Sequence, residues 1–114
     1  MSIRNTSEKS VFTISARTAS ENSSTISVDE YLEGDLHIDI TAASGTNETL
    51  QFAVQAQITD SSSAWKYIAI GKRHYATDTE IIPLTNFGKQ IRVQAIIGGT
   101  SPSFTFTSDF VGKT

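Results

Sequence analysis

The chain has 114 residues, of which 38% are hydrophobic and 18% charged, and its formal net charge is −3. This length fits one domain with one core, and no apolar run approaches the roughly 20 residues that a membrane-spanning helix needs. The sequence contains no cysteine, which excludes disulfides, thiolate metal sites and cysteine nucleophiles. Its acidic balance and scattered basic residues do not favour a nucleic-acid-binding protein.

The first ten residues are polar, and hydrophobic alternation begins directly after them. Phe12, Ile14 and Ala16 alternate with polar residues, and a period of two is typical of half-buried β-strands. The sequence therefore predicts a polar N-terminal arm of residues 1–10 and a single β-domain of residues 11–114.

The same alternation continues to the end of the chain, and no segment has the spacing of an amphipathic helix. The best helical candidate, residues 28–33, is one turn at most. Residues 18–25 are rich in Ser, Thr and Asn and predict a long exposed connection. Residues 65–70 predict a buried strand, and residues 80–84 a short one that ends at Pro83.

These patterns predict an all-β fold, an antiparallel β-sandwich of about seven to eight strands, either immunoglobulin-like or jelly-roll-like. The residues expected to face its core, in chain order after residue 17, are Ile26, Val28, Leu36, Ile38, Ile40, Ala42, Leu50, Phe52, Val54, Ala56, Ile58, Ile91, Val93, Ala95, Ile97, Phe104, Phe106, Ser108 and Phe110.

Two segments resemble each other. Residues 40–52 and 95–106 both run from an apolar strand through a Gly-Thr pair into a second apolar strand. After the Gly-Thr pair, Leu50 and Phe52 correspond to Phe104 and Phe106. Since Gly-Thr is a common turn pair, we interpret the segments as two β-hairpins that cover a shared core. The alternative is a duplicated ligand loop.

His37 and Asp39 are the first place to look for chemistry, because they lie on one face of a predicted strand with Asp35 two residues earlier. A carboxylate and an imidazole can bind a metal or orient a base. This face is opposite Leu36 and Ile38, and nothing in the sequence identifies a third ligand. We interpret it as a solvated face and predict no enzyme, no catalytic residues, no metal and no cofactor.

The second candidate is an aromatic and cationic patch around a predicted loop at residues 71–75. Aromatic rings stack on sugars, and Lys or Arg binds anionic groups. The alternative is that the aromatic side chains anchor the core. The candidate ligand or partner residues are Trp65, Lys72, Arg73, His74 and Tyr75.

The C-terminal quarter of the chain contains a recognisable sequence motif. Residues 90–106 read QIRVQAIIGGTSPSFTF and are followed by Asp109, Phe110 and Val111. This segment resembles small structural proteins of tailed bacteriophages, which commonly end in a strand pair R-V-x-A-x-x-G-G-T-S-P-S-F-T-F. An earlier Ser-Gly-Thr segment at residues 44–46 and a later Trp65 match the same layout, so the likeness covers residues 34–113. The chain departs from it at residues 72–75, where a more acidic or Gly-rich loop is expected.

The resemblance implies a virion component that is assembled in the host cytoplasm, such as a capsid-decoration or head-fibre β-sandwich. Its expected partners are the major capsid protein or other virion proteins and further copies of itself, with no nucleic acid and no membrane. Outward Gln and Thr side chains would supply hydrogen-bonded contacts. An alternative is a carbohydrate-binding or host-adhesion module that uses residues 65–75, and a third option is an enzyme that uses His37 and Asp39.

Overall fold

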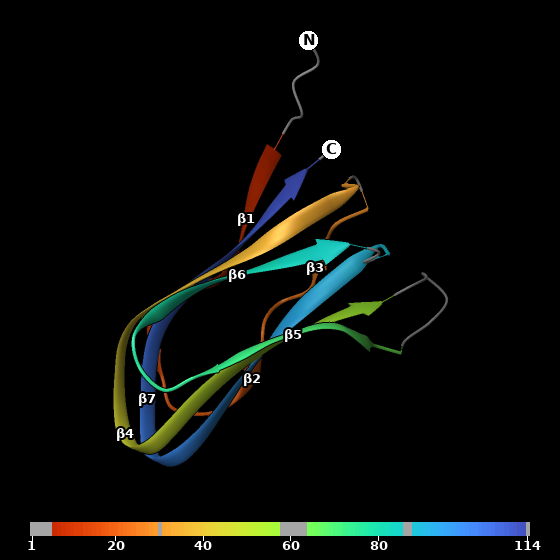
Figure 1. The fold of residues 1–114 in the computed structure, drawn as a ribbon. Coiled ribbons are helices and arrows are strands. Elements are labelled where there is room, and N and C mark those ends of the chain that lie inside the picture. The colour runs from red at the N-terminus through yellow and green to blue at the C-terminus, as the bar shows by residue number, and fades with distance from the viewer. Residues whose placement is uncertain (1–5, 30, 58–63, 86–87, 114) are drawn as a thin grey trace.

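The computed structural model describes residues 6–29, 31–57, 64–85 and 88–113. Within these residues the chain forms seven antiparallel β-strands and no helix, so no described helix is long and apolar enough to span a membrane. The strands are β1 (Thr6–Arg17), β2 (Glu21–Asn22), β3 (Ile26–Ser27), β4 (Glu33–Gln57), β5 (Lys66–His74), β6 (Asp78–Thr85) and β7 (Gln90–Lys113), as labelled in Figure 1.

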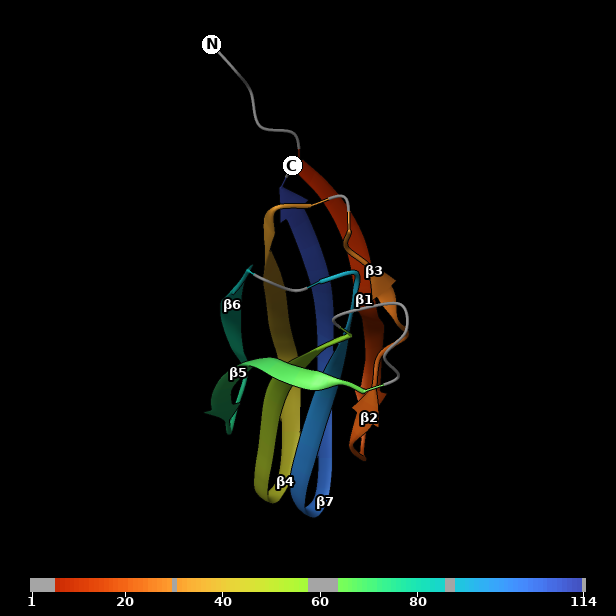
Figure 2. The same cartoon turned by 90° about the vertical axis from the view of Figure 1, so that its right-hand side faces the viewer.

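Two long strands, β4 and β7, build the centre of the fold. They pair with each other from Glu33 opposite Lys113 to Gln57 opposite Gln90, and Figure 1 and Figure 2 show both folding back at the same point. The folded ribbon makes two layers. Layer A contains β1, β6, residues 33–43 of β4 and residues 104–113 of β7; layer B contains β2, β3, β5, residues 50–57 of β4 and residues 90–97 of β7. The predicted β-sandwich class is therefore confirmed.

The bends in β4 and β7 have the same pattern of positive φ angles. The positive φ angles are 128° at Gly45 and 55° at Asn47 in β4, and 114° at Gly99 and 48° at Ser101 in β7. Thr46 pairs with Thr100 between them, so the two strands are related by an approximate two-fold axis at this pair. Left-handed backbone costs a residue with a Cβ roughly 1–2 kcal/mol, which explains why glycine occupies the more extreme position in each strand.

The prediction of two hairpins was wrong. The two halves of β4 do not pair with each other; each pairs with a half of β7. A hairpin and a folded ribbon share the same local sequence, two alternating strands with positive-φ residues between them, and differ only in long-range pairing. The internal similarity between residues 40–52 and 95–106 marks the bend itself.

The core lies between the layers and contains a cluster of three aromatic rings. Phe106 contacts Phe52 and Phe12 edge to face, with ring centroids 5.0 and 5.4 Å apart, and burial of each ring stabilises the fold by about 1.5–3 kcal/mol. The predicted inward residues that are buried as expected are Phe12, Ile26, Val28, Leu36, Ile38, Ile40, Leu50, Phe52, Val54, Ala56, Ile91, Val93, Ala95, Phe104, Phe106, Ser108 and Phe110.

Three residues predicted to face the core do not follow the pattern, and a fourth, Ile97, packs against the core but is only partly buried. Ile14, at 63% exposure, and Ala16 are exposed because β1 shifts register twice against β7. Ala42 is exposed because β4 shifts register just before it, and Ile97 is only half-buried. A bulge adds one residue and moves the following side chains to the other face. The remaining expected core residue, Ile58, lies outside the described residues.

The strands β5 and β6 differ from their predictions in extent and burial. The strand expected at residues 65–70 runs on to His74 and is not buried, because β5 is the edge of layer B, and Tyr67 and Ile70 are more than half exposed. The short strand at residues 80–84 exists but is longer, and Pro83 faces outward on an edge strand, where proline is tolerated.

The N-terminal part of the chain is more ordered than its composition indicates. Strand β1 begins at Thr6, so residues 6–10 of the predicted arm belong to the sheet, whereas residues 1–5 lie outside the described residues. Near the helical candidate at residues 28–33, the Tyr31 N–H donates to the Val28 carbonyl at 3.1 Å, which makes a turn.

The connection at residues 18–25 covers the edge of β7. The Ser20 hydroxyl accepts from the Ile97 N–H at 2.8 Å. The Val93 N–H donates to the Ser23 hydroxyl at 2.8 Å, and the Ser23 N–H donates to the Val93 carbonyl at 2.7 Å. With β2 pairing between them, the segment satisfies a strand edge that would otherwise be open to another chain. The predicted connection is exposed as expected, and in addition it pairs along the edge of β7.

Candidate functional site

The five residues of the predicted patch do not form one patch. Trp65 precedes β5 and His74 ends it, and a nine-residue strand separates its ends by about 30 Å. Lys72, Arg73 and His74 lie in the strand rather than in a loop, and only Tyr75 belongs to the connection that follows. Because successive side chains in a strand point to opposite faces, Arg73 and His74 point in opposite directions.

Arg73 belongs to the outer face of layer B, which we call the basic face. Residues directly opposite each other in antiparallel strands share a face, so the register defines its members. They are Gln51, Ala53 and Gln55 of β4, Tyr67, Ile70 and Arg73 of β5, and Arg92, Gln94 and Ile96 of β7, with Trp65 stacked on Arg92.

Contacts between three strands fix the aromatic side chains on the basic face. The Arg92 guanidinium lies 4.5 Å from the centroid of the Trp65 ring, and its Nε donates to Gln55 Oε1 at 2.7 Å. The Tyr67 hydroxyl donates to Gln94 Oε1 at 2.8 Å. A cation over an indole ring contributes about 0.5–1 kcal/mol at an exposed site. These contacts hold the aromatic side chains in place on a partly apolar surface, on which Tyr67 is still 55% exposed.

His74 points the other way, into a corner where β5 of layer B turns into β6 of layer A. Its side chain is 1% exposed, and Nε2 lies 2.7 Å from Glu80 Oε1. Nδ1 is 3.3 Å from Asp78 Oδ2 but is not aligned for a hydrogen bond. An imidazole that donates through Nε2 to Glu80 leaves Nδ1 as an acceptor, which explains the missing bond. The prediction that His74 belongs to a ligand patch was wrong, because the side chain is buried.

Lys72 completes this corner. Its Nζ lies 2.8 Å from Asp78 Oδ2, and its backbone N–H donates to Glu80 Oε2 at 2.9 Å. The hydrogen bond with Asp78 raises the pKa of Lys72. The hydrogen bonds from Lys72 and from the Thr79 N–H lower the pKa of Asp78. The corner therefore fastens layer A to layer B, and its polar groups are engaged in structure.

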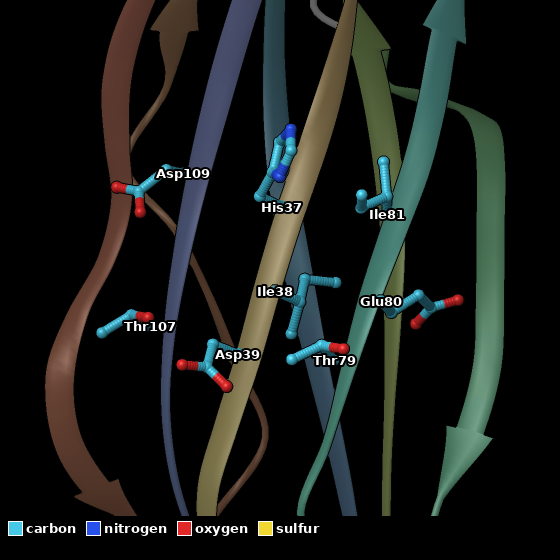
Figure 3. A pocket seen from close by; sticks show the side chains of 8 residues that line it. All are labelled: His37, Ile38, Asp39, Thr79, Glu80, Ile81, Thr107 and Asp109. Carbon is cyan, nitrogen blue, oxygen red and sulfur yellow. The ribbon is translucent and has the colours of Figure 1, made fainter.

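The outer face of layer A, which we call the acidic face, contains the other sequence candidates. His37 and Asp39 are both exposed on it, as the alternation predicted. They line a groove of about 230 Å³ that Figure 3 shows between β4, β6 and β7. By register, the members of the face are Glu8 and Ser10 of β1, Glu33, Asp35, His37 and Asp39 of β4, Thr79, Ile81, Pro83 and Thr85 of β6, and Thr107, Asp109, Val111 and Lys113 of β7.

The groove places His37 opposite Asp109 of β7 and keeps it apart from Asp39 on its own strand. His37 and Asp39 are two residues apart on one strand, roughly 7 Å, whereas a base and its orienting group must lie within about 3 Å. No group of three His, Cys, Asp or Glu side chains in this part of the chain is arranged to hold a metal ion. The arrangement is an exposed acidic surface with Asp39 and Asp109 at the groove.

Sequence reasoning missed one cation that closes the core. The Arg17 guanidinium lies over the rings of Phe12 and Phe106, at 4.9 and 5.4 Å from their centroids. It pairs with Glu21 and donates to the Thr13 carbonyl at 2.9 Å. A hollow of about 440 Å³ lies beside it between β1 and residues 21–24. The Arg17 guanidinium therefore covers the apolar rings of Phe12 and Phe106.

No family model, no curated protein and no solved structure matches the chain. Its chemistry therefore has to be argued from its own surfaces, among them the acidic face and the basic face, which have exposed side chains on several described strands.

Proposed function

We propose that the chain is a non-enzymatic virion structural protein that decorates or stabilises a bacteriophage capsid through protein–protein contacts. The observation that carries the proposal is that both broad faces of the sandwich have large exposed side chains, such as Ile81 and Tyr67, while the buried imidazole of His74 and its neighbours are engaged in fastening the layers. The resemblance to tailed-phage structural proteins supports the choice of particle. It covers residues 34–113, which include nearly all of β4 and β7, the two strands that run through both layers.

The dimensions of the molecule support a role in contacts. The principal extents are 48 × 37 × 20 Å, and because the shortest extent runs across the strands (Figure 2), each broad face is close to the roughly 800 Å² per partner that a stable interface buries. Gln51, Thr79 and Thr107 are among the outward amides and hydroxyls of the two faces, and such groups form hydrogen bonds without a large charge penalty. The partners under this proposal are the major capsid protein or other virion proteins.

The test is the protein content of particles made by the virus whose genome encodes the chain. Quantitative mass spectrometry of purified particles is expected to find the chain in many copies at a fixed ratio to the shell protein. Particles made without the gene are expected to take up the added purified chain to that ratio. Absence of the chain from purified particles overturns the proposal.

A second candidate function is glycan binding, favoured by the aromatic and amide side chains of the basic face. Trp65 and Tyr67 lie there beside Arg92 and Gln55, and aromatic rings present an apolar surface to sugars. Against the sequence prediction, Lys72 and His74 have no part in this surface.

A matched pair of tyrosine variants tests glycan binding. Tyr67 and Tyr75 are exposed to a similar extent, at 55% and 60%, but Tyr75 lies in the β5–β6 connection. Tyr67→Ala is expected to weaken glycan binding about tenfold, the effect of about 1.4 kcal/mol, and Tyr75→Ala to leave it unchanged. Equal effects of both variants, or no binding on a glycan array, reject this candidate.

A further inference from the structure

The two broad faces of the sandwich carry opposite charge. The acidic face has five carboxylates, those of Glu8, Glu33, Asp35, Asp39 and Asp109, and one ammonium group, that of Lys113, which pairs with Asp35 at 3.0 Å. The basic face has the guanidinium groups of Arg73 and Arg92, and none of its described positions has a carboxylate.

Three charged side chains on the two faces have no partner among the described residues. Asp39, Asp109 and Arg73 take part in no ion pair or side-chain hydrogen bond among the described residues. By contrast, the Lys72 ammonium next to Arg73 is paired with Asp78. Asp39, Asp109 and Arg73 are thus unpaired charges on the two faces, whereas Lys72 is paired at the corner between the layers.

Both faces also expose apolar side chains next to these charges. Ile81, at the edge of the acidic groove, is 60% exposed, and Ile70 and Ile96 are exposed on the basic face. An interface core of apolar side chains surrounded by charged pairs is the usual composition of protein–protein contacts. A charged small ligand would not explain the apolar residues on both sides.

We infer that the chain binds a second copy of itself face to back: the basic face of one copy lies on the acidic face of the next, with Arg73 in the groove between Asp39 and Asp109. A guanidinium is planar and can donate to two carboxylates at once. The groove places Asp39 and Asp109 on adjacent strands, β4 and β7, as Figure 3 shows.

The geometry decides the type of assembly. The two faces are the outer sides of layer A and layer B, on opposite sides of the sandwich, so one face of a partner cannot contact both. A complex of two copies leaves one acidic and one basic face exposed, and further copies add to them. Such a heterologous contact produces a ring or an open stack, and never a closed two-fold dimer.

Sedimentation velocity of the full chain tests the inference. At low salt the sedimentation coefficient is expected to rise with concentration beyond the value for a dimer, or to reach that of a ring. In about 1 M salt, where the Debye length is about 3 Å, the charge pairs are screened and the equilibrium is expected to shift toward monomer. A chain that is monomeric at low salt and high concentration overturns the inference, as does a closed dimer.

Charge reversal identifies the contact. Arg73→Glu and Asp109→Arg are each expected to weaken association at least tenfold, and the two changes together in one chain are expected to restore much of it. Lys72→Glu is the charge control for Arg73→Glu, with the same change of charge on a neighbouring residue outside both faces; because it also loses the pair with Asp78, its stability is measured as well, and the folded variant should associate like the wild type. Circular dichroism confirms that each variant is folded.

Equal loss in Lys72→Glu and Arg73→Glu overturns the inference, since net charge alone would then explain the effect. A loss in both single variants without recovery in the double variant rejects the Arg73–Asp109 pairing. Loss of glycan binding in Arg73→Glu, by a protein that stays monomeric, assigns the basic face to sugar instead. A chain that is monomeric in solution and yet present on particles overturns the inference and leaves the proposed function intact.

Discussion

The bend in β4 and β7 should be the position most sensitive to the smallest possible substitution. Gly99 has a φ of 114°, and a Cβ built there lies 2.8 Å from the Asn47 carbonyl oxygen and 2.8 Å from Glu48 Cα. Both are backbone atoms of the paired strand and cannot move as a side chain does. Gly99→Ala therefore forces the two strands apart at the point where the sandwich folds.

Two energetic costs add up in the Gly99→Ala variant. A residue with a Cβ in this backbone region costs about 1–3 kcal/mol, and the steric conflict adds a similar amount. We expect a loss of about 3 kcal/mol in the free energy of unfolding, which corresponds to a fall of roughly 10 °C in Tm for a domain of this size. Urea denaturation followed by tryptophan fluorescence measures the first quantity, and circular dichroism the second.

The neighbouring glycine is the control. Gly98 has no positive φ, and the one heavy atom near its virtual Cβ is the Thr49 hydroxyl at 3.0 Å, the end of a side chain that can rotate. Gly98→Ala is expected to change the free energy of unfolding by less than about 1 kcal/mol. If both variants lose the same stability, or if Gly99→Ala loses none, the bend does not depend on backbone freedom at Gly99, and this reasoning fails.

Three further substitutions test the edge, the bend and the corner. Ser23→Ala removes the hydroxyl that accepts from Val93 and should cost about 1–3 kcal/mol in urea denaturation, because it leaves a backbone donor unpaired; a loss below about 0.5 kcal/mol would show that water replaces the serine. Ser101→Asn should raise Tm by a few degrees, because asparagine tolerates a φ of 48° better than serine. Asp78→Asn should lower the free energy of unfolding at neutral pH. The hydrogen bond from Lys72 lowers the pKa of Asp78 from 3.8, so its stabilisation is present above that value and is lost as the pH falls through the lowered pKa. The curves for Asp78→Asn and wild type should therefore converge in acid, and a difference that persists there contradicts the assignment.

The faces of individual strands could be predicted because they depend on local sequence. Leu36, Ile38 and Ile40 point inward as the period of two requires. The pairing of the strands could not be predicted, because it joins residues that are far apart in the chain. The register shifts in β1 were equally hidden, since nothing in the alternation of Phe12, Ile14 and Ala16 indicates that the pairing of β1 with β7 shifts register twice.

The residues of the candidate patch could not be placed correctly for the same physical reason, because their neighbours depend on strand pairing. Nearness in sequence is not nearness in an extended strand, so Trp65 and His74 came to lie at opposite ends of β5. The partner of Trp65 is Arg92, which belongs to β7. Its sequence signal was present, as a polar residue that alternates with the buried Ile91 and Val93, but only the pairing of β4 with both neighbours connects it to the tryptophan.

The folded ribbon also explains how opposite charges come to opposite faces. The outward carboxylates Asp35 and Asp39 precede the bend in β4, whereas Asp109 follows it in β7 and Arg92 precedes it. Because the strands are antiparallel and fold together, the first half of β4 meets the second half of β7 in layer A. A net charge of −3 conceals this separation, since carboxylates about 70 residues apart in the chain meet on one face only after the bend forms. The two surfaces available for binding are thus a consequence of the same two glycines, Gly45 and Gly99, that allow the ribbon to fold.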